Sequence, residues 1–147
     1  MGETMQRIMI VGGAGYVGGY LTDYLDIRAP QINSKIPSSS PQNEVLVYDK
    51  LVYENRYLKN VPFMCGDIRD TDKLKGTIDE WKPDVIVWLA AIVGDGACQL
   101  DPQLTNEVNY ESVKWLSDNY KGKIVFTSTC SVYGENDDLI NEEDETN

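Results

Sequence analysis

Runs of apolar residues alternate with stretches of helical spacing along most of this 147-residue chain. Consecutive apolar positions, rather than alternating ones, are typical of strands that are buried on both faces of a parallel sheet. The run at 84–91 is almost entirely apolar, which predicts a place near the centre of the sheet. The expected strands are 7–12, 44–49, 61–66, 84–91 and 122–129.

Three helices are predicted between the strands, because apolar residues recur there at steps of three and four. One begins at Gly15, one covers 71–82 with Thr71 or Asp70 as its N-cap, and one covers 104–120. Their expected buried positions are Val17, Leu21, Tyr24 and Leu25 in the first, Leu74, Ile78 and Trp81 in the second, and Leu104, Val108, Ser112 and Leu116 in the third.

The order of these elements predicts the fold class. Strands that alternate with helices indicate right-handed β-α-β units and a parallel sheet covered on both faces. We therefore expect an α/β fold, a doubly wound parallel sheet of the Rossmann type with about five strands, in one domain over residues 1–134. Residues 29–43, with three prolines and four serines, are expected to form an exposed, mobile loop. Residues 135–147 carry seven acids and no base, which predicts a flexible acidic tail.

Composition excludes several classes of function. The net charge is −11, of which the tail supplies −7, and this argues against binding to nucleic acid. No apolar stretch approaches the roughly 20 residues that cross a membrane, and the N-terminus lacks a signal-peptide pattern, so we expect a cytoplasmic protein without membrane contact. The chain has no histidine and three widely spaced cysteines, which excludes histidine-based catalysis and argues against a disulfide framework or a metal site.

Glycines gather where the first strand passes into the first helix. Gly12, Gly15 and Gly18 form a G-x-x-G-x-x-G pattern at this junction. Such spacing allows a sharp turn, a close approach of the backbone to a pyrophosphate and tight packing of the helix, whose N-terminus favours an anion. The alternative interpretation is a tightly packed helix entry that binds no ligand.

An acid at the end of the second strand favours the dinucleotide-binding interpretation over that of a packed helix entry. Asp49 stands where a dinucleotide-binding fold needs a carboxylate for the ribose hydroxyls. It follows Gly18 by 31 residues rather than about 20, and an insertion at 29–43 would account for the surplus. A carboxylate repels a 2′-phosphate, so NAD is favoured over NADP, although the adjacent Lys50 tempers this preference.

Four motifs then follow the order of one known family. The stretches "VGGAGYVGG", "GDIRD", "WLAAIVG" and "TSTCSVYG" resemble the extended short-chain dehydrogenase/reductase family, which includes NAD-dependent nucleotide-sugar epimerases and dehydratases. The resemblance runs nearly end to end and implies that Asp67 bonds the adenine amino group, Ile68 packs on the ring and Asn109 braces the central strands. The cofactor-binding residues that it implies are Gly12, Gly15, Tyr16, Val17, Gly18, Asp49, Lys50, Asp67, Ile68, Leu89, Ala90, Ala91, Val93, Asn109 and Thr127.

The same resemblance places Thr129 at the position of a catalytic hydroxyl, which would hydrogen-bond a sugar oxygen during hydride transfer. The alternative is a strand-end hydroxyl satisfied by the backbone. Cys130 and Ser131 stand where the dehydratases of the family carry an Asp-Glu pair. This departure favours epimerase or dehydrogenase chemistry over dehydration.

The catalytic Tyr-x-x-x-Lys of the family is expected after Thr129 and is missing there, because Tyr133 is followed four residues later by Asp137. We therefore expect the cofactor half of an NAD-dependent nucleotide-sugar epimerase or dehydrogenase, truncated before the substrate domain and inactive by itself. The abrupt acidic ending favours truncation of a longer gene over a natural short protein. A sheet without its further strands is also expected to self-associate.

Two other interpretations stay open at this point. The chain could be a non-catalytic dinucleotide-binding or sensor module, which would bind NAD without any sugar. It could also share the fold and bind no dinucleotide, in which case the glycines serve the turn alone.

Overall fold

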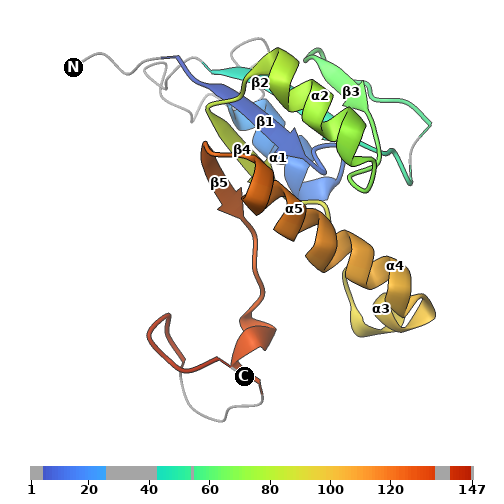
Figure 1. The fold of residues 1–147 in the computed structure, drawn as a ribbon, viewed down its shortest axis with the longest axis vertical. Coiled ribbons are helices and arrows are strands. Elements are labelled where there is room, and N and C mark those ends of the chain that lie inside the picture. The colour runs from blue at the N-terminus through green and yellow to red at the C-terminus, as the bar shows by residue number, and fades with distance from the viewer. Residues whose placement is uncertain (1–4, 26–42, 54, 135–139, 147) are drawn as a thin grey trace.

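The structure, a computed structural model, describes residues 5–25, 43–53, 55–134 and 140–146. Its centre is a five-stranded sheet in the order β3-β2-β1-β4-β5, with every neighbouring pair parallel (Figure 1). The α/β class and the number of strands are therefore confirmed. The strands are β1 Arg7–Val11, β2 Glu44–Asp49, β3 Phe63–Cys65, β4 Val85–Trp88 and β5 Lys123–Phe126.

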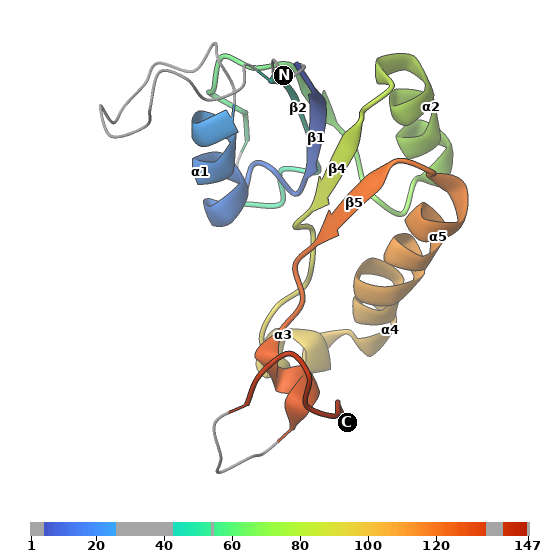
Figure 2. The same ribbon diagram turned by 90° about the vertical axis from the view of Figure 1, so that its left-hand side faces the viewer.

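Helices cover both faces of the sheet, so the sheet is doubly wound. Helix α1 (Tyr16–Leu25) lies on one face, and α2 (Thr71–Trp81) and α5 (Ser112–Asn119) lie on the other (Figure 2). One apolar core lies under α1 and is built on Ile10 and Val47. The second core lies under α2 and α5 and includes Trp88. Strand β4 is buried along its whole length, as its apolar run predicts.

The predicted buried face of the first helix is partly wrong. Val17 is 60% exposed and Tyr24 is 50% exposed, whereas Gly18 and Thr22 are buried. The reason is the close approach of Gly18 to the preceding turn, which rotates the helix so that Gly18 and Thr22 face inward with Leu21 and Leu25 beside them. The Thr22 hydroxyl is satisfied within the helix, since it donates to the Gly18 carbonyl at 2.7 Å.

The second helix agrees with its prediction. Asp70 is its N-cap and accepts a 3.1 Å hydrogen bond from the Lys73 amide. Leu74 is fully buried, and Ile78 and Trp81 pack against the same core. The helix ends at Trp81, and its C-cap, Lys82, is in the left-handed region with φ +52° and precedes Pro83.

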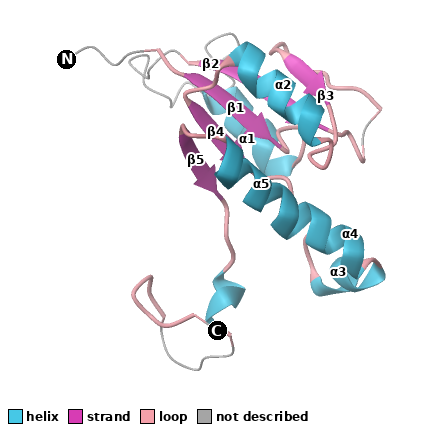
Figure 3. Ribbon diagram, viewed as in Figure 1, coloured by secondary structure: helices cyan, strands magenta, loops and turns pink. Residues whose placement is uncertain are grey.

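The helix predicted over 104–120, which carries the labels α4 and α5 in Figure 3, is built from three consecutive segments. These are α4 (Pro102–Asn106), a π-helical segment (Glu107–Glu111) and α5, and the expected stripe is buried at Ser112 and Leu116. A short helix that the sequence did not predict, α3 (Asp95–Leu100), precedes them. After β5 the chain leads away from the sheet to a 3₁₀ segment, Cys130–Tyr133 (Figure 1).

Two sequence predictions lie largely outside the described residues, namely the mobile loop at 29–43 and the first part of the acidic tail. Within the described part of the chain, no helix is long and apolar enough to cross a membrane.

Candidate cofactor-binding site

A cleft of about 500 Å³ opens at the carboxyl edge of the sheet. It lies where the strand order reverses, because the chain runs from β1 outward to β3 on one side and then to β4 on the other. Open α/β sheets bind their ligands at such a switch point. Ten of the predicted cofactor residues line the cleft: Gly12, Gly15, Asp49, Lys50, Asp67, Ile68, Leu89, Ala90, Ala91 and Val93.

Sequence reasoning missed the other residues of the wall. Arg69 and Gly66 lie in the "GDIRD" motif, Ala14 in "VGGAGYVGG" and Ile92 in "WLAAIVG", so these motifs could have signalled them. The other missed residues lie outside the quoted motifs. These are Tyr48, Leu51, Val52, Tyr53, Ala97, Leu104 and Val108.

The three glycines of the first turn meet different requirements. Gly12 has φ +83°, and a Cβ there would lie 2.5 Å from the Ala90 nitrogen. A Cβ at Gly18 would lie 2.5 Å from the Gly13 Cα. Both glycines are therefore required by the fold. A Cβ at Gly15 would approach, among the described residues, the Gly12 carbonyl alone, at an ordinary 3.4 Å. Gly15 thus keeps space open on the cleft side rather than between packed elements.

The carboxylate of Asp49 joins the end of β2 to the glycine turn. Its Oδ2 accepts the Ala14 amide at 3.0 Å, and its Oδ1 accepts the Leu51 amide at 2.7 Å. Leu51 itself is in the left-handed region, with φ +57°. Each carboxylate oxygen can accept a further hydrogen bond, so Asp49 keeps acceptors for ligand hydroxyls.

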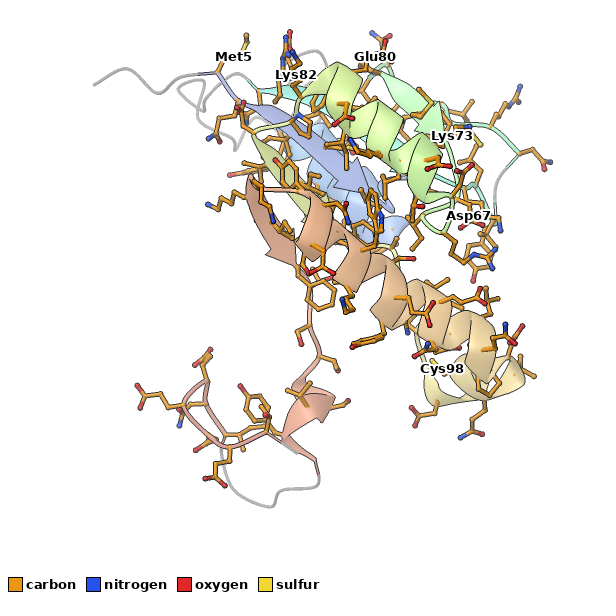
Figure 4. All side chains as sticks on the ribbon, in the orientation of Figure 1. Met5, Asp67, Lys73, Glu80, Lys82 and Cys98 are labelled. Carbon is orange, nitrogen blue, oxygen red and sulfur yellow. The ribbon has the colours of Figure 1, made fainter. Side chains whose placement is uncertain are left out.

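A second carboxylate, Asp67, lies in the turn that precedes α2, on the side that faces α4 (Figure 4). It is paired with two cations, since Arg69 Nη2 and Lys50 Nζ each lie 2.8 Å from its Oδ2. Hydrogen bonds from Arg69 hold the pKa of Asp67 far below its usual range. Arg69 continues the network to Glu107 at 2.9 Å, and this contact also lowers the pKa of Glu107. The carboxylate of Asp67 is therefore ionised and fixed at the mouth of the cleft.

Six of the predicted residues are not among those that line the cleft. Gly18 is buried below the turn, while Tyr16 and Val17 are exposed at the start of α1. The Asn109 side chain is hydrogen-bonded to the loop after β4: it accepts the Ile92 amide and donates to the Ile92 carbonyl, both at 2.8 Å. This contact agrees with a bracing role.

The last two predicted residues, Thr127 and Thr129, lie in the segment after β5. Thr127 bonds the Trp88 carbonyl through its hydroxyl at 3.3 Å. Thr129 caps the 3₁₀ segment, since its hydroxyl oxygen accepts the Ser131 amide at 3.2 Å and also donates to the Ser131 hydroxyl. Both hydroxyls have protein partners, as a structural role would require, and the roles of Thr127 and Thr129 toward a ligand stay predictions.

The expectation that the chain lacks a Tyr-x-x-x-Lys pair needs a correction. Tyr110 and Lys114 have this spacing, upstream of β5 rather than after Thr129. Tyr110 is 61% exposed, and Lys114 pairs with Asp118 at 2.7 Å on the outer surface of the helix. Neither residue lines the cleft. The chain therefore contains residues with the Tyr-x-x-x-Lys spacing, but they lie outside the candidate site.

The described residues contain no group of three or more His, Cys, Asp or Glu side chains that could hold a metal ion. They do offer a glycine turn at a helix N-terminus, a carboxylate at the end of β2 and an apolar floor formed by Leu89 to Ala91. Residues of these kinds in this arrangement suit a phosphate-linked dinucleotide.

Comparisons with known proteins also indicate a family of NAD-dependent proteins. The model of the NAD dependent epimerase/dehydratase family matches residues 8–147. A dTDP-D-glucose 4,6-dehydratase of Dictyostelium discoideum is 33% identical, and the match covers 97% of this chain and 33% of that protein. A UDP-glucose 4-epimerase of Halalkalibacterium halodurans is 30% identical over 87% of this chain and 36% of its own length.

Solved structures agree at the level of the fold. The crystal structure of UDP-glucose 4-epimerase from Brucella ovis in complex with NAD superposes with a TM-score of 0.75 at 24% identity, over 97% of this chain and 42% of that one. The chain thus spans about a third of the length of these curated relatives and about two fifths of this structural neighbour. Because the family model matches nearly the whole sequence, the chain belongs to the NAD dependent epimerase/dehydratase family.

Proposed function

We propose that this chain binds NAD in the cleft and supplies the cofactor-binding half of an NAD-dependent nucleotide-sugar epimerase or dehydrogenase. The observation that carries the proposal is the pairing of Gly15 with Asp49. Gly15 leaves open space at the start of α1, and Asp49, which accepts the neighbouring Ala14 amide, lines the same cleft with acceptors to spare. Phosphate on one side and ribose hydroxyls on the other would fill that gap.

Each part of the cleft has a role in this proposal. The first amides of α1, at Tyr16 and Val17, would face the pyrophosphate, because the first turn of a helix has N–H groups without partners inside the helix. Asp49 would accept the adenosine ribose hydroxyls. Asp67 would accept the adenine amino group, with Ile68 against the ring. When bound, NAD supplies a hydride acceptor or donor at its nicotinamide ring.

Turnover by these residues alone is proposed to be negligible. Thr129 would orient a sugar oxygen, but no Tyr-x-x-x-Lys pair lies among the described residues of the cleft wall. Cys130 and Ser131 in place of an acid pair support epimerase or dehydrogenase chemistry over dehydration. The exposed position of Tyr110 and Lys114 favours a second candidate, a non-catalytic NAD-binding or sensor module.

Calorimetry tests the proposal directly. We expect the purified chain to bind NAD with a saturable heat in the absence of any sugar and to bind NADP more weakly. Gly15→Val is expected to abolish the heat, because its side chain fills the space that Gly15 leaves open on the cleft side. Val125→Thr, at an exposed position of β5, is the control and should bind like the wild type. A wild-type chain that binds no NAD would refute the proposal for this chain.

Two further properties belong to the same proposal. Self-association is supported by β5, which is the last strand of the sheet and exposes Val125 and Phe126. A cytoplasmic location is supported by the free thiols of Cys65 and Cys98.

A further inference from the structure

The side chain of Tyr48 reaches from β2 to the turn that follows β3. It is fully buried, and its hydroxyl donates to the Asp67 main-chain carbonyl at 3.1 Å. Gly66 makes room for the ring, because a Cβ there would lie 2.2 Å from the Tyr48 hydroxyl oxygen. Tyrosine at 48 and glycine at 66 are therefore sterically complementary.

The last two residues of β2, Tyr48 and Asp49, hold both walls of the cleft through their main-chain carbonyls. The Tyr48 carbonyl accepts the Gly12 amide at 2.9 Å, which fixes the glycine turn. The Asp49 carbonyl accepts the Gly66 amide, also at 2.9 Å, which fixes the start of the second turn. The main-chain contact of Asp49 stops at Gly66, whereas the side chain of Tyr48 reaches the carbonyl of the next residue, Asp67.

We propose that Tyr48 is a positioning residue for the dinucleotide, whose hydroxyl sets the Gly66–Arg69 turn so that Asp67 and Ile68 face the adenine. The inference rests on the proposed function and names a determinant of the same site. Deep burial raises the pKa of Tyr48 to about 12, so the phenol is protonated and donates throughout the neutral range. The Asp67 carbonyl also accepts the Asp70 amide at 3.1 Å, so the turn and the N-cap of α2 share this anchor.

A second tyrosine in the chain provides a matched control. Tyr120 donates its hydroxyl to the Pro83 carbonyl at 2.8 Å, and a Cβ at Gly122 would lie 2.1 Å from that hydroxyl. This is the same arrangement of tyrosine, glycine and backbone carbonyl, at a place that does not line the cleft. Tyr48→Phe and Tyr120→Phe each remove one such hydrogen bond while keeping the ring.

The experiment measures the affinity of AMP and of NAD by calorimetry for the wild type and both variants of the full chain. We expect Tyr48→Phe to weaken both ligands about five-fold, as the loss of one hydrogen bond predicts, and Tyr120→Phe to leave both unchanged. Amide hydrogen exchange of the free proteins is the second readout. Exchange of the Asp70 amide should accelerate in Tyr48→Phe and not in Tyr120→Phe.

The outcomes separate this inference from the proposed function. A wild type that binds neither AMP nor NAD overturns the proposed function, while the exchange rates still report whether Tyr48 holds the turn. A wild type that binds, with equal affinities and equal exchange in Tyr48→Phe, overturns the positioning role. Equal losses of affinity in both variants would mean that general destabilisation is the cause, which also overturns it.

Discussion

The Ala14 amide donates a 3.0 Å hydrogen bond to Asp49 Oδ2, which ties the glycine turn after β1 to the end of β2 across 35 residues of sequence. The contact fixes the distance between the two places where a dinucleotide would be held, its phosphates and its ribose. A change at Asp49 is therefore expected to affect both at once.

Asp49→Ala removes the proposed ribose acceptor and leaves the Ala14 and Leu51 amides without this carboxylate partner. We expect NAD affinity to fall at least tenfold, since a hydrogen bond to a charged group is worth about 1.5–3 kcal/mol. The loss for NADP should be smaller, because removal of the carboxylate also removes repulsion of the 2′-phosphate. Calorimetry with both ligands measures the ratio. Asp118→Ala, on the outer surface of α5, is the control, and an unchanged NAD affinity in Asp49→Ala would contradict the assignment.

Gly15 and Gly18 should respond differently to the same small change. Gly15→Ala meets ordinary contacts and should leave the free energy of unfolding nearly unchanged while it weakens NAD. Gly18→Ala forces a Cβ to within 2.5 Å of the Gly13 Cα and should cost about 1–3 kcal/mol of stability. Urea denaturation and NAD titration of both variants check the contrast. A destabilised Gly15→Ala that binds NAD normally would show that the glycine serves the fold alone.

The lowered pKa of Asp67 makes part of the stability depend on pH. A carboxyl whose pKa is lower in the folded state contributes stability above the unfolded value, about 4, and loses it as the pH falls through the folded value. We expect the stability difference between the wild type and Asp67→Asn to be constant near neutral pH and to shrink below about pH 4. Arg69→Met should raise the pKa of Asp67 toward its ordinary value, as NMR titration would measure. Lys114→Met is the control, and a pKa of Asp67 that stays unchanged in Arg69→Met would contradict the role of this ion pair.

Much of this arrangement could be predicted from the sequence, because local patterns determine it. Apolar runs located all five strands, and β2 matches its predicted range at both ends. Motif spacing identified Gly12 and Asp49 on the cleft wall, and the resemblance to the family identified Asp67. The contact of Tyr48 with Gly66 could not be predicted, because it depends on the register that sets Tyr48 beside Met64.

The exposed residues of α1 could not be predicted either, for a related reason. The spacing of apolar residues predicts the buried face of a helix only when the packing of its side chains decides how the helix is rotated about its axis. Here the close approach of Gly18 to Gly13 sets the rotation, so Val17 faces outward although it is apolar. The π-helical segment at Glu107–Glu111 likewise has no signal in the apolar spacing, which Ser112 and Leu116 continue beyond it.

The free edge of β5 predicts self-association. Val125 and Phe126 are 41% and 51% exposed on a strand that carries one charge, Lys123. Sedimentation velocity should show dimers or larger species that increase with protein concentration. Val125→Lys, which adds a charge to this edge, should shift the distribution toward monomer, whereas Val52→Lys, at an exposed position away from β5, should not. A wild type that stays monomeric at every concentration would contradict the prediction.

The Tyr110–Lys114 pair leads to a last prediction, about turnover. Its side chains lie outside the cleft, and Lys114 pairs with Asp118, so we expect this pair not to deliver a base to a sugar bound beside NAD in the cleft. We expect the purified chain with NAD and UDP-glucose to give no epimerised product above the rate without protein, as followed by NMR of the anomeric protons. Tyr110→Phe should leave NAD affinity unchanged. Turnover by the wild type that is lost in Tyr110→Phe would show that this pair is catalytic, and would move the active site from the cleft to the outer surface of the helix.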